Sequence, residues 1–100
     1  MDEIKVYYNT ELSNEIISNV EFEPLPAGKI TLKSLYFQNT TEFPINTHIK
    51  LIGEDIRVKS DIAMLEAGEV KPYVIEIKPK VTSLKPIQAR LEVQIDYIVI

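Results

Sequence analysis

Hydrophobic and polar residues alternate along most of this chain, and the alternation is clearest in the last thirteen residues, Gln88 to Ile100. Its apolar positions are Ala89, Leu91, Val93, Ile95, Tyr97 and Val99, and the polar positions between them are Arg90, Glu92, Gln94 and Asp96. Because successive side chains of a strand point to opposite faces, this period of two predicts a β-strand with one dry and one solvated face. We therefore expect an antiparallel β protein.

The same alternation predicts further strands earlier in the chain. We expect them at residues 3–8, 20–23, 30–38, 45–51, 56–58, 62–65 and 73–77, before the closing strand at 88–100. The segment from Asn9 to Asn19 does not alternate clearly and is either one helical turn or a loop. Seven or eight strands at intervals of about 8–12 residues, with turn residues between them, predict an antiparallel sandwich or barrel.

One predicted strand breaks the period. Ile30 and Leu32 share one parity, whereas Leu35 and Phe37 share the other. A β-bulge near Lys33-Ser34 is expected to bring all four side chains to the inner face. The residues expected on the inner faces are Ile30, Leu32, Leu35, Phe37, Ile45, Ile49, Leu51, Ile75, Ile77, Leu91, Val93 and Ile95. Burial of such side chains, at about 1.5–3 kcal/mol each, can offset the ordering entropy without a disulfide or a metal.

The composition supports this interpretation. Fifteen Ile and eight Val stand against four Ala, and β-branched side chains favour strands over helices. One hundred residues without a linker-like stretch predict one domain spanning residues 1–100.

Charge and targeting signals narrow the classes of partner. A net charge of −4 and dispersed basic residues argue against nucleic-acid binding, and no apolar run reaches the ~20 residues of a membrane span. The absence of Cys excludes disulfides and thiolate metal sites. No signal peptide is visible, so we expect a cytoplasmic protein as made, either a complete product or a piece of a longer chain.

Two stretches resemble immunoglobulin-like sandwich domains. Residues Leu35 to Thr41, followed by Phe43-Pro44-Ile45, are similar to the apolar-x-apolar-x-Asn-Thr step between the second and third strands of such domains. Residues Leu65 to Glu69 resemble their Leu-x-Pro-Gly-Glu turn, with Ala67 in place of the usual Pro. The Cys and Trp residues of antibody domains are absent. The resemblance implies an all-β, antiparallel immunoglobulin-like β-sandwich of seven to eight strands, of the prokaryotic or viral kind, without an active site.

The chemistry of two turn residues agrees with this resemblance. Asn39 can bond its own backbone and tolerates left-handed geometry at a turn. Gly68 is expected to supply a positive φ.

The only histidine, His48, lies on the outward parity of its predicted strand, beside Asn46 and Lys50. A catalytic or metal-binding histidine needs a nucleophile or further ligands. No second His and no Cys is available, so His48 is interpreted as a surface residue. No catalytic, cofactor-binding or metal-binding residue is expected.

Carboxylates at two sets of positions could suggest a calcium site or a glycosidase active site. Glu54, Asp55 and Asp61 lie in neighbouring predicted loops and offer oxygens to calcium, but their spacing fits no calcium-binding motif, which favours solvated turns.

Two same-face pairs, Glu21 with Glu23 and Glu92 with Asp96, could suggest a glycosidase. Ion pairs with Lys or Arg across strands are the favoured interpretation.

Partner contacts are expected at both ends of the chain. Tyr7 and Tyr8 place one ring on each face of the first strand, so one ring should be exposed. Ile98, Val99 and Ile100 are apolar on both faces and extend a strand that is already long. Either they contact another subunit or another copy, or the N-terminal segment covers both faces of this end. Their deletion is expected to weaken association more than it lowers the melting temperature.

The sequence allows three functions from different classes. A non-catalytic structural or interaction module is favoured, and the resemblance implies a component of a larger assembly such as a phage capsid or tail, incorporated into a virion, with other protein subunits or itself as partner. The alternative is a carbohydrate-binding or cell-surface adhesion module cut from a larger protein. An enzyme ranks third because no convergent titratable residues are visible.

Overall fold

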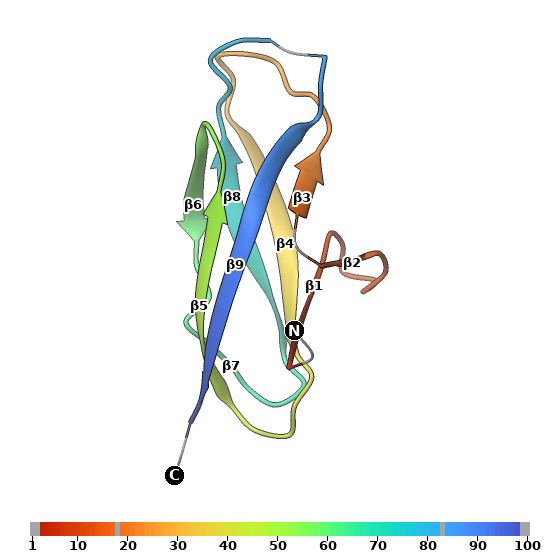
Figure 1. Cartoon of the computed structure of the whole chain (residues 1–100), viewed down its shortest axis with the longest axis vertical. Helices are drawn as coiled ribbons and strands as arrows, with labels where there is room; N and C mark the ends of the chain where they lie inside the picture. The colour runs from red at the N-terminus through yellow and green to blue at the C-terminus, as the bar shows by residue number, and fades with distance from the viewer. Residues whose placement is uncertain (1–2, 18, 83, 99–100) are drawn as a thin grey trace.

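The chain forms two antiparallel β-sheets that stack face to face (Figure 1). The computed structural model describes residues 3–17, 19–82 and 84–98, and these residues contain no helix. The strands are β1 (Ile4–Tyr7), β2 (Glu15–Ile16), β3 (Asn19–Phe22), β4 (Thr31–Asn39), β5 (Ile45–Ile52), β6 (Ile56–Ser60), β7 (Met64–Leu65), β8 (Val70–Ile77) and β9 (Ile87–Tyr97). The molecule is elongated, 48 × 22 × 18 Å. The prediction of an all-β antiparallel sandwich is confirmed.

Each sheet is built around one long pair of strands. The first sheet has the order β2-β1-β4-β8-β6, and the second has the order β3-β9-β5-β7. Strand β4 pairs with β8 from Thr31 to Gln38, and β5 pairs with β9 from Ile45 to Ile52. Both pairs join segments far apart in the sequence, so the fold depends on non-local contacts.

The segment between β1 and β3 is a loop with one short strand, which resolves the choice left open by the sequence. The side-chain oxygen Oδ1 of Asn9 accepts hydrogen bonds from the backbone N–H groups of Glu11 (3.1 Å) and Ser13 (3.4 Å). The Asn9 side chain thus bonds backbone N–H groups that a helix would use for its own hydrogen bonds. Strand β2 then pairs with β1 at Val6 and Tyr7. Nine strands are therefore present where seven or eight were expected; the additional one is β2, which is only two residues long.

The predicted bulge in β4 is wrong. The pairing of β4 with β8 is continuous, so the parity that buries Leu35 and Phe37 holds along the whole strand. Leu32 therefore lies on the outer face and is 51% exposed. Ile30 precedes the strand and is 53% exposed. Leu25, which is buried, instead fills this end of the core beside Ile77.

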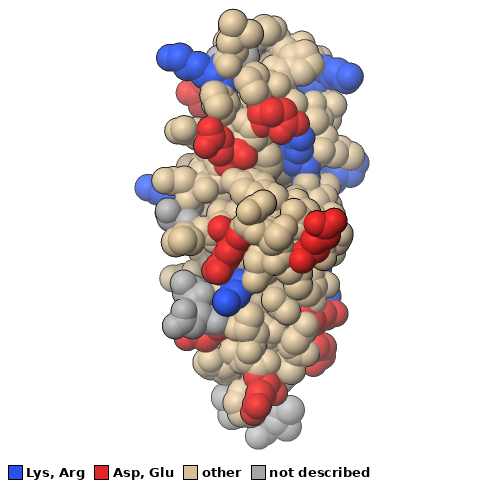
Figure 2. Space-filling view, turned by 90° about the vertical axis from the view of Figure 1, so that its right-hand side faces the viewer, with Lys and Arg blue, Asp and Glu red and all other residues tan. Residues whose placement is uncertain are grey.

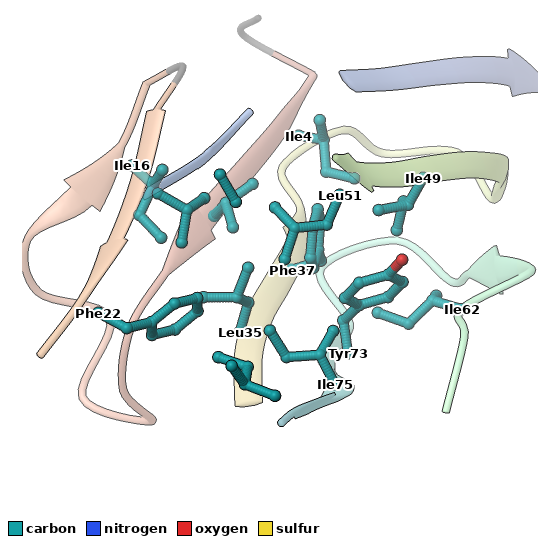
Figure 3. Close-up of a cluster of buried hydrophobic side chains, with 14 of the residues drawn as sticks. Ile4, Ile16, Phe22, Leu35, Phe37, Ile49, Leu51, Ile62, Tyr73 and Ile75 are labelled. Atoms are coloured by element: carbon teal, nitrogen blue, oxygen red, sulfur yellow. The ribbon is translucent and has the colours of Figure 1, made fainter. Parts of the chain in front are cut away.

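The core lies between the two sheets (Figure 3). Leu35, Phe37, Tyr73, Ile75 and Ile77 enter it from the first sheet, and the rings of Phe37 and Tyr73 meet edge to face at 5.6 Å. Members of the buried hydrophobic core outside the predicted set are Ile4, Val6, Ile16, Val20, Phe22, Leu25, Ile62, Leu65, Tyr73 and Ala89. The predicted core residues of β9, namely Leu91, Val93 and Ile95, are only half-buried.

Asn39 is fully buried and organises the turn after β4. Its side-chain nitrogen Nδ2 donates to the carbonyl oxygens of Phe43 (2.7 Å), Leu65 (3.2 Å) and Glu66 (3.1 Å). Its Oδ1 accepts from the backbone N–H of Thr41 (2.9 Å), as expected of an Asn at a turn. Asn39 itself remains within β4 and does not use the left-handed conformation that an Asn tolerates. Gly68 does, with φ of 73°.

Candidate interaction site

Strand β9 is longer than either of its neighbours, and one side of it is left without a partner. It pairs with β3 from Ile87 to Arg90 and with β5 from Arg90 to Tyr97, on opposite sides. From Leu91 to Tyr97 a strand therefore lies only on the β5 side. We call the opposite side of Leu91–Tyr97 the open edge; in Figure 1 it lies below β3.

The backbone of the open edge presents unpaired hydrogen-bonding groups. The N–H of Ile98 donates to the carbonyl oxygen of Pro44 (3.2 Å), on the β5 side. Because alternate residues of a strand direct their N–H and C=O groups to opposite sides, Leu91, Val93 and Ile95 direct theirs to the open edge. No strand of the described chain pairs with Val93 or Ile95 on this side, and no backbone hydrogen bond from a described turn or loop reaches them. Such a row is a template for another strand.

The outermost strands of the two sheets, β2 and β6 in one and β3 and β7 in the other, carry features that discourage strand addition. Strand β6 has a bulge between Val58 and Ser60 and bears Arg57 and Lys59. Strands β2 and β7 have two residues each, and β3 has four and is soon followed by Pro24. Bulges, basic residues, prolines and short length all protect edges. The open edge has no Pro and no Lys, and its pairing with β5 is regular.

A groove of about 200 Å³ runs between the open edge and the edge of the other sheet. Its lining residues are Ile4 and Val6 from β1, Glu15 and Ile16 from β2, Ile17, and Leu91 and Val93 from β9. Ile4, Val6 and Ile16 are buried, whereas Ile17 is 87% exposed. The half-buried inner face of β9 is therefore one wall of an opening in the side of the sandwich, which six aliphatic residues and Glu15 line.

Carboxylates predominate around this opening. Glu92 and Asp96 project from the outer face of the open edge, Glu15 lines the groove, and no Lys or Arg lies from Leu91 to Tyr97. The side of the molecule nearest β1, β2 and β3 carries acidic side chains over its central part (Figure 2). The nearest basic partner in β9 is Arg90, whose Nη2 lies 2.9 Å from Oε1 of Glu92.

The two tyrosines predicted to contact a partner lie outside the groove lining. Tyr7 is 8% exposed and Tyr8 is 37% exposed, which confirms that one ring lies on each face. The backbone N–H of Glu21 donates to the hydroxyl of Tyr8 (2.9 Å), and the ring of Tyr8 meets Phe22 edge to face at 6.4 Å. Tyr8 therefore helps to hold β3 in place.

The sequence placed the C-terminal contact at Ile98, Val99 and Ile100. Ile98 is half-buried, and Val99 and Ile100 lie outside the described residues. In the structure, the candidate contact is instead the open edge of Leu91–Tyr97 in β9, which precedes these three residues. The signal in the sequence was length: a closing strand of eleven residues cannot be covered on that side by a four-residue β3.

His48 is exposed on β5, as expected, and its Nε2 lies 3.3 Å from Oδ2 of Asp96. Two of the carboxylates singled out by the sequence, Glu23 and Glu92, make ion pairs with basic residues. Glu23 bonds Lys33, and this hydrogen bond lowers the pKa of Glu23 below its usual value of 4.5. Glu92 pairs with Arg90 of its own strand, not with a residue across the sheet.

The loop carboxylates do not converge. Strand β6 separates Asp55 from Asp61, so they lie at opposite ends of that strand. Asp55 accepts a hydrogen bond from the backbone N–H of Lys80 (3.3 Å), and Asp61 accepts one from Ile62 (2.7 Å). Within residues 3–17, 19–82 and 84–98, no group of three His, Cys, Asp or Glu is placed to hold a metal ion.

Tyr73 is the most perturbed of the titratable groups with a resolved shift. Burial raises its pKa to about 12, and the negative charge of Asp61 adds to the effect. Its hydroxyl is buried and has no hydrogen-bond partner among the described residues. A phenol enclosed in the core is a packing residue and not a site for chemistry.

Comparison with known proteins returns no relative. No protein-family model, no curated protein and no solved structure matches this chain. The described residues form no helix of the length and apolarity needed to cross a membrane. The open edge and its groove are the strongest candidate for a functional site.

Proposed function

We propose that this protein is a non-catalytic interaction module that joins a larger assembly through the open edge of β9. The observation that carries the proposal is the run from Leu91 to Tyr97, with outward-facing backbone groups beside a groove that aliphatic residues and Glu15 line. Backbone groups of this kind provide affinity when a strand is added, and pockets beside them provide specificity.

We also propose an immunoglobulin-like sandwich, and the strand order supports it. Such domains place strands A, B, E and D in one sheet and C, F and G in the other. Here β1-β4-β8-β6 would correspond to A-B-E-D, and β5 and β9 to C and F. Strand G would lie beside F, where β3 covers β9 only as far as Arg90. The open edge thus corresponds to an incompletely filled strand position. A phage capsid or tail is the assembly that the sequence resemblance favours.

A variant pair tests this proposal. Val93→Pro removes an edge-facing N–H, and Val93→Ala removes most of the same side chain but keeps that N–H. Each variant is co-expressed with the proteins encoded beside its gene, and complexes are isolated by size-exclusion chromatography. We expect a stoichiometric complex with wild type and Val93→Ala and none with Val93→Pro. A complex that survives Val93→Pro, or none with wild type, would overturn the proposal.

Carbohydrate binding is the second candidate, and one observation favours it. Phe43 and Tyr97 are 60% and 49% exposed, with ring centroids 6.4 Å apart. Their planes are at 87°, so the pair does not form one flat stacking surface, and this function ranks second. Retardation in polysaccharide gels, abolished by Tyr97→Ala, would reverse the order.

A further inference from the structure

We infer that the open edge accepts an extended segment of another polypeptide in which apolar residues alternate with Lys or Arg. The inference rests on the proposed function and names the chemistry of the partner. It follows from the geometry of the edge and from the charges beside it.

The geometry fixes the alternation of the segment. A strand added beside Leu91–Tyr97 would bond the outward N–H and C=O groups of Leu91, Val93 and Ile95. Its side chains would then point alternately to the two faces of the sheet. On the inner face they would enter the groove lined by Ile4 and Val6, where apolar side chains gain most from burial.

The charges beside the open edge determine which residues suit the outward-facing positions of the added strand. Outward side chains of the added strand would lie across from Glu92 and Asp96. Opposite charges paired across strands stabilise a sheet by about 0.2–1 kcal/mol each, and like charges destabilise it. Basic residues in the intervening positions therefore complement this edge.

A second copy of this chain fits the edge poorly. Antiparallel pairing of two open edges about a two-fold axis at Gln94 is the register that uses all of Leu91–Tyr97. In that register Glu92 of one copy faces Asp96 of the other. The two-fold symmetry produces this pair of like charges twice, once from each copy. The net charge of −4 on each copy adds to it.

A pair of synthetic peptides tests the inference on the full-length protein. The first is a capped nine-residue peptide of alternating Lys and Val, and the second replaces each Lys by Glu. Fluorescence anisotropy at low salt measures both. We expect micromolar binding of the basic peptide and at least tenfold weaker binding of the acidic one. Val93→Pro should weaken binding of the basic peptide at least tenfold, and Val93→Ala less than threefold.

Amide hydrogen exchange on the wild type provides a readout that does not depend on a variant's folding. The basic peptide should slow exchange at Val93 and Ile95, whereas Gln94, whose N–H faces β5, should change little. Equal binding of the two peptides, or no protection at Val93 and Ile95, would overturn the inference. So would a dimer detected by light scattering and abolished by Val93→Pro. Each of these results leaves the complex with neighbouring gene products as a separate test of the proposed function.

Discussion

The side-chain nitrogen of Asn39 lies 3.2 Å from the carbonyl oxygen of Leu65, and this hydrogen bond joins the two sheets. Asn39 ends β4 in the first sheet, and Leu65 ends β7 in the second. Leu65 is fully buried, so its carbonyl oxygen depends on a partner from the protein. The hydrogen bond therefore holds the end of β4 against the end of β7, across the two sheets.

We expect Asn39→Ala to lower the free energy of unfolding by about 2–3 kcal/mol, because it removes the side chain that donates to three carbonyl groups and accepts from the backbone N–H of Thr41. Chemical denaturation measures the change. Asn46→Ala, at an exposed position of β5, is the control and should stay within about 0.5 kcal/mol of wild type. A loss below 0.5 kcal/mol for Asn39→Ala would show that these hydrogen bonds are replaceable.

Tyr73→Phe should leave stability unchanged or raise it by about 1 kcal/mol. The substitution keeps the ring packed on Phe37 and removes a buried hydroxyl that has no partner among the described residues. Thermal unfolding measures this, with about 4–8 °C expected per kcal/mol for a domain of this size. Clear destabilisation would mean that the hydroxyl is hydrogen-bonded in solution.

The raised pKa of Tyr73 predicts a loss of stability at alkaline pH. Its pKa is about 12 in the folded state and about 10 in the unfolded chain, so the folded state holds the proton more tightly. This contribution is complete below pH 10 and is lost as the pH rises towards 12. Denaturation midpoints across that window should fall less steeply in Tyr73→Phe. Identical slopes would contradict the assignment.

Gly53→Ala should destabilise the protein by about 1–2 kcal/mol through overpacking. A Cβ at this position would lie 2.7 Å from Cδ1 of Ile56, 3.2 Å from Cβ of Ala89 and 3.3 Å from the carbonyl oxygen of Gln88. Ile56→Val removes the first of these atoms, so the double variant should lose less than the sum of the single changes. Strict additivity in a double-mutant cycle would exclude the clash.

Lys33→Met should raise the pKa of Glu23 back towards 4.5, because the hydrogen bond from Lys33 is the main cause of its lowered value. A lowered folded pKa stabilises the protein above the unfolded value, and this is lost as the pH falls through the folded value. Both side chains are partly exposed, so the effect on stability should be small. Titration of Glu23 by NMR measures the shift; an unchanged pKa would rule out the bond in solution.

The periodicity of the sequence was sufficient to predict most strands. Alternation located β5, β8 and β9 within a few residues, because one buried face imposes a period of two. It failed in β4, where apolar residues occur on both parities. Pairing with β8 decided which parity is buried, and it left Leu32 outside and Phe37 inside.

The sequence by itself determined that this chain forms sheets with one apolar face, because local alternation reports which side of each strand avoids water. Tertiary structure alone decided which strand edges remain open. Whether Leu91–Tyr97 has a neighbour depends on how far β3 extends along β9, a relation between residues some seventy positions apart. Every residue type except Pro carries the same backbone N–H and C=O groups, so the alternation of side chains does not show how far a neighbouring strand extends.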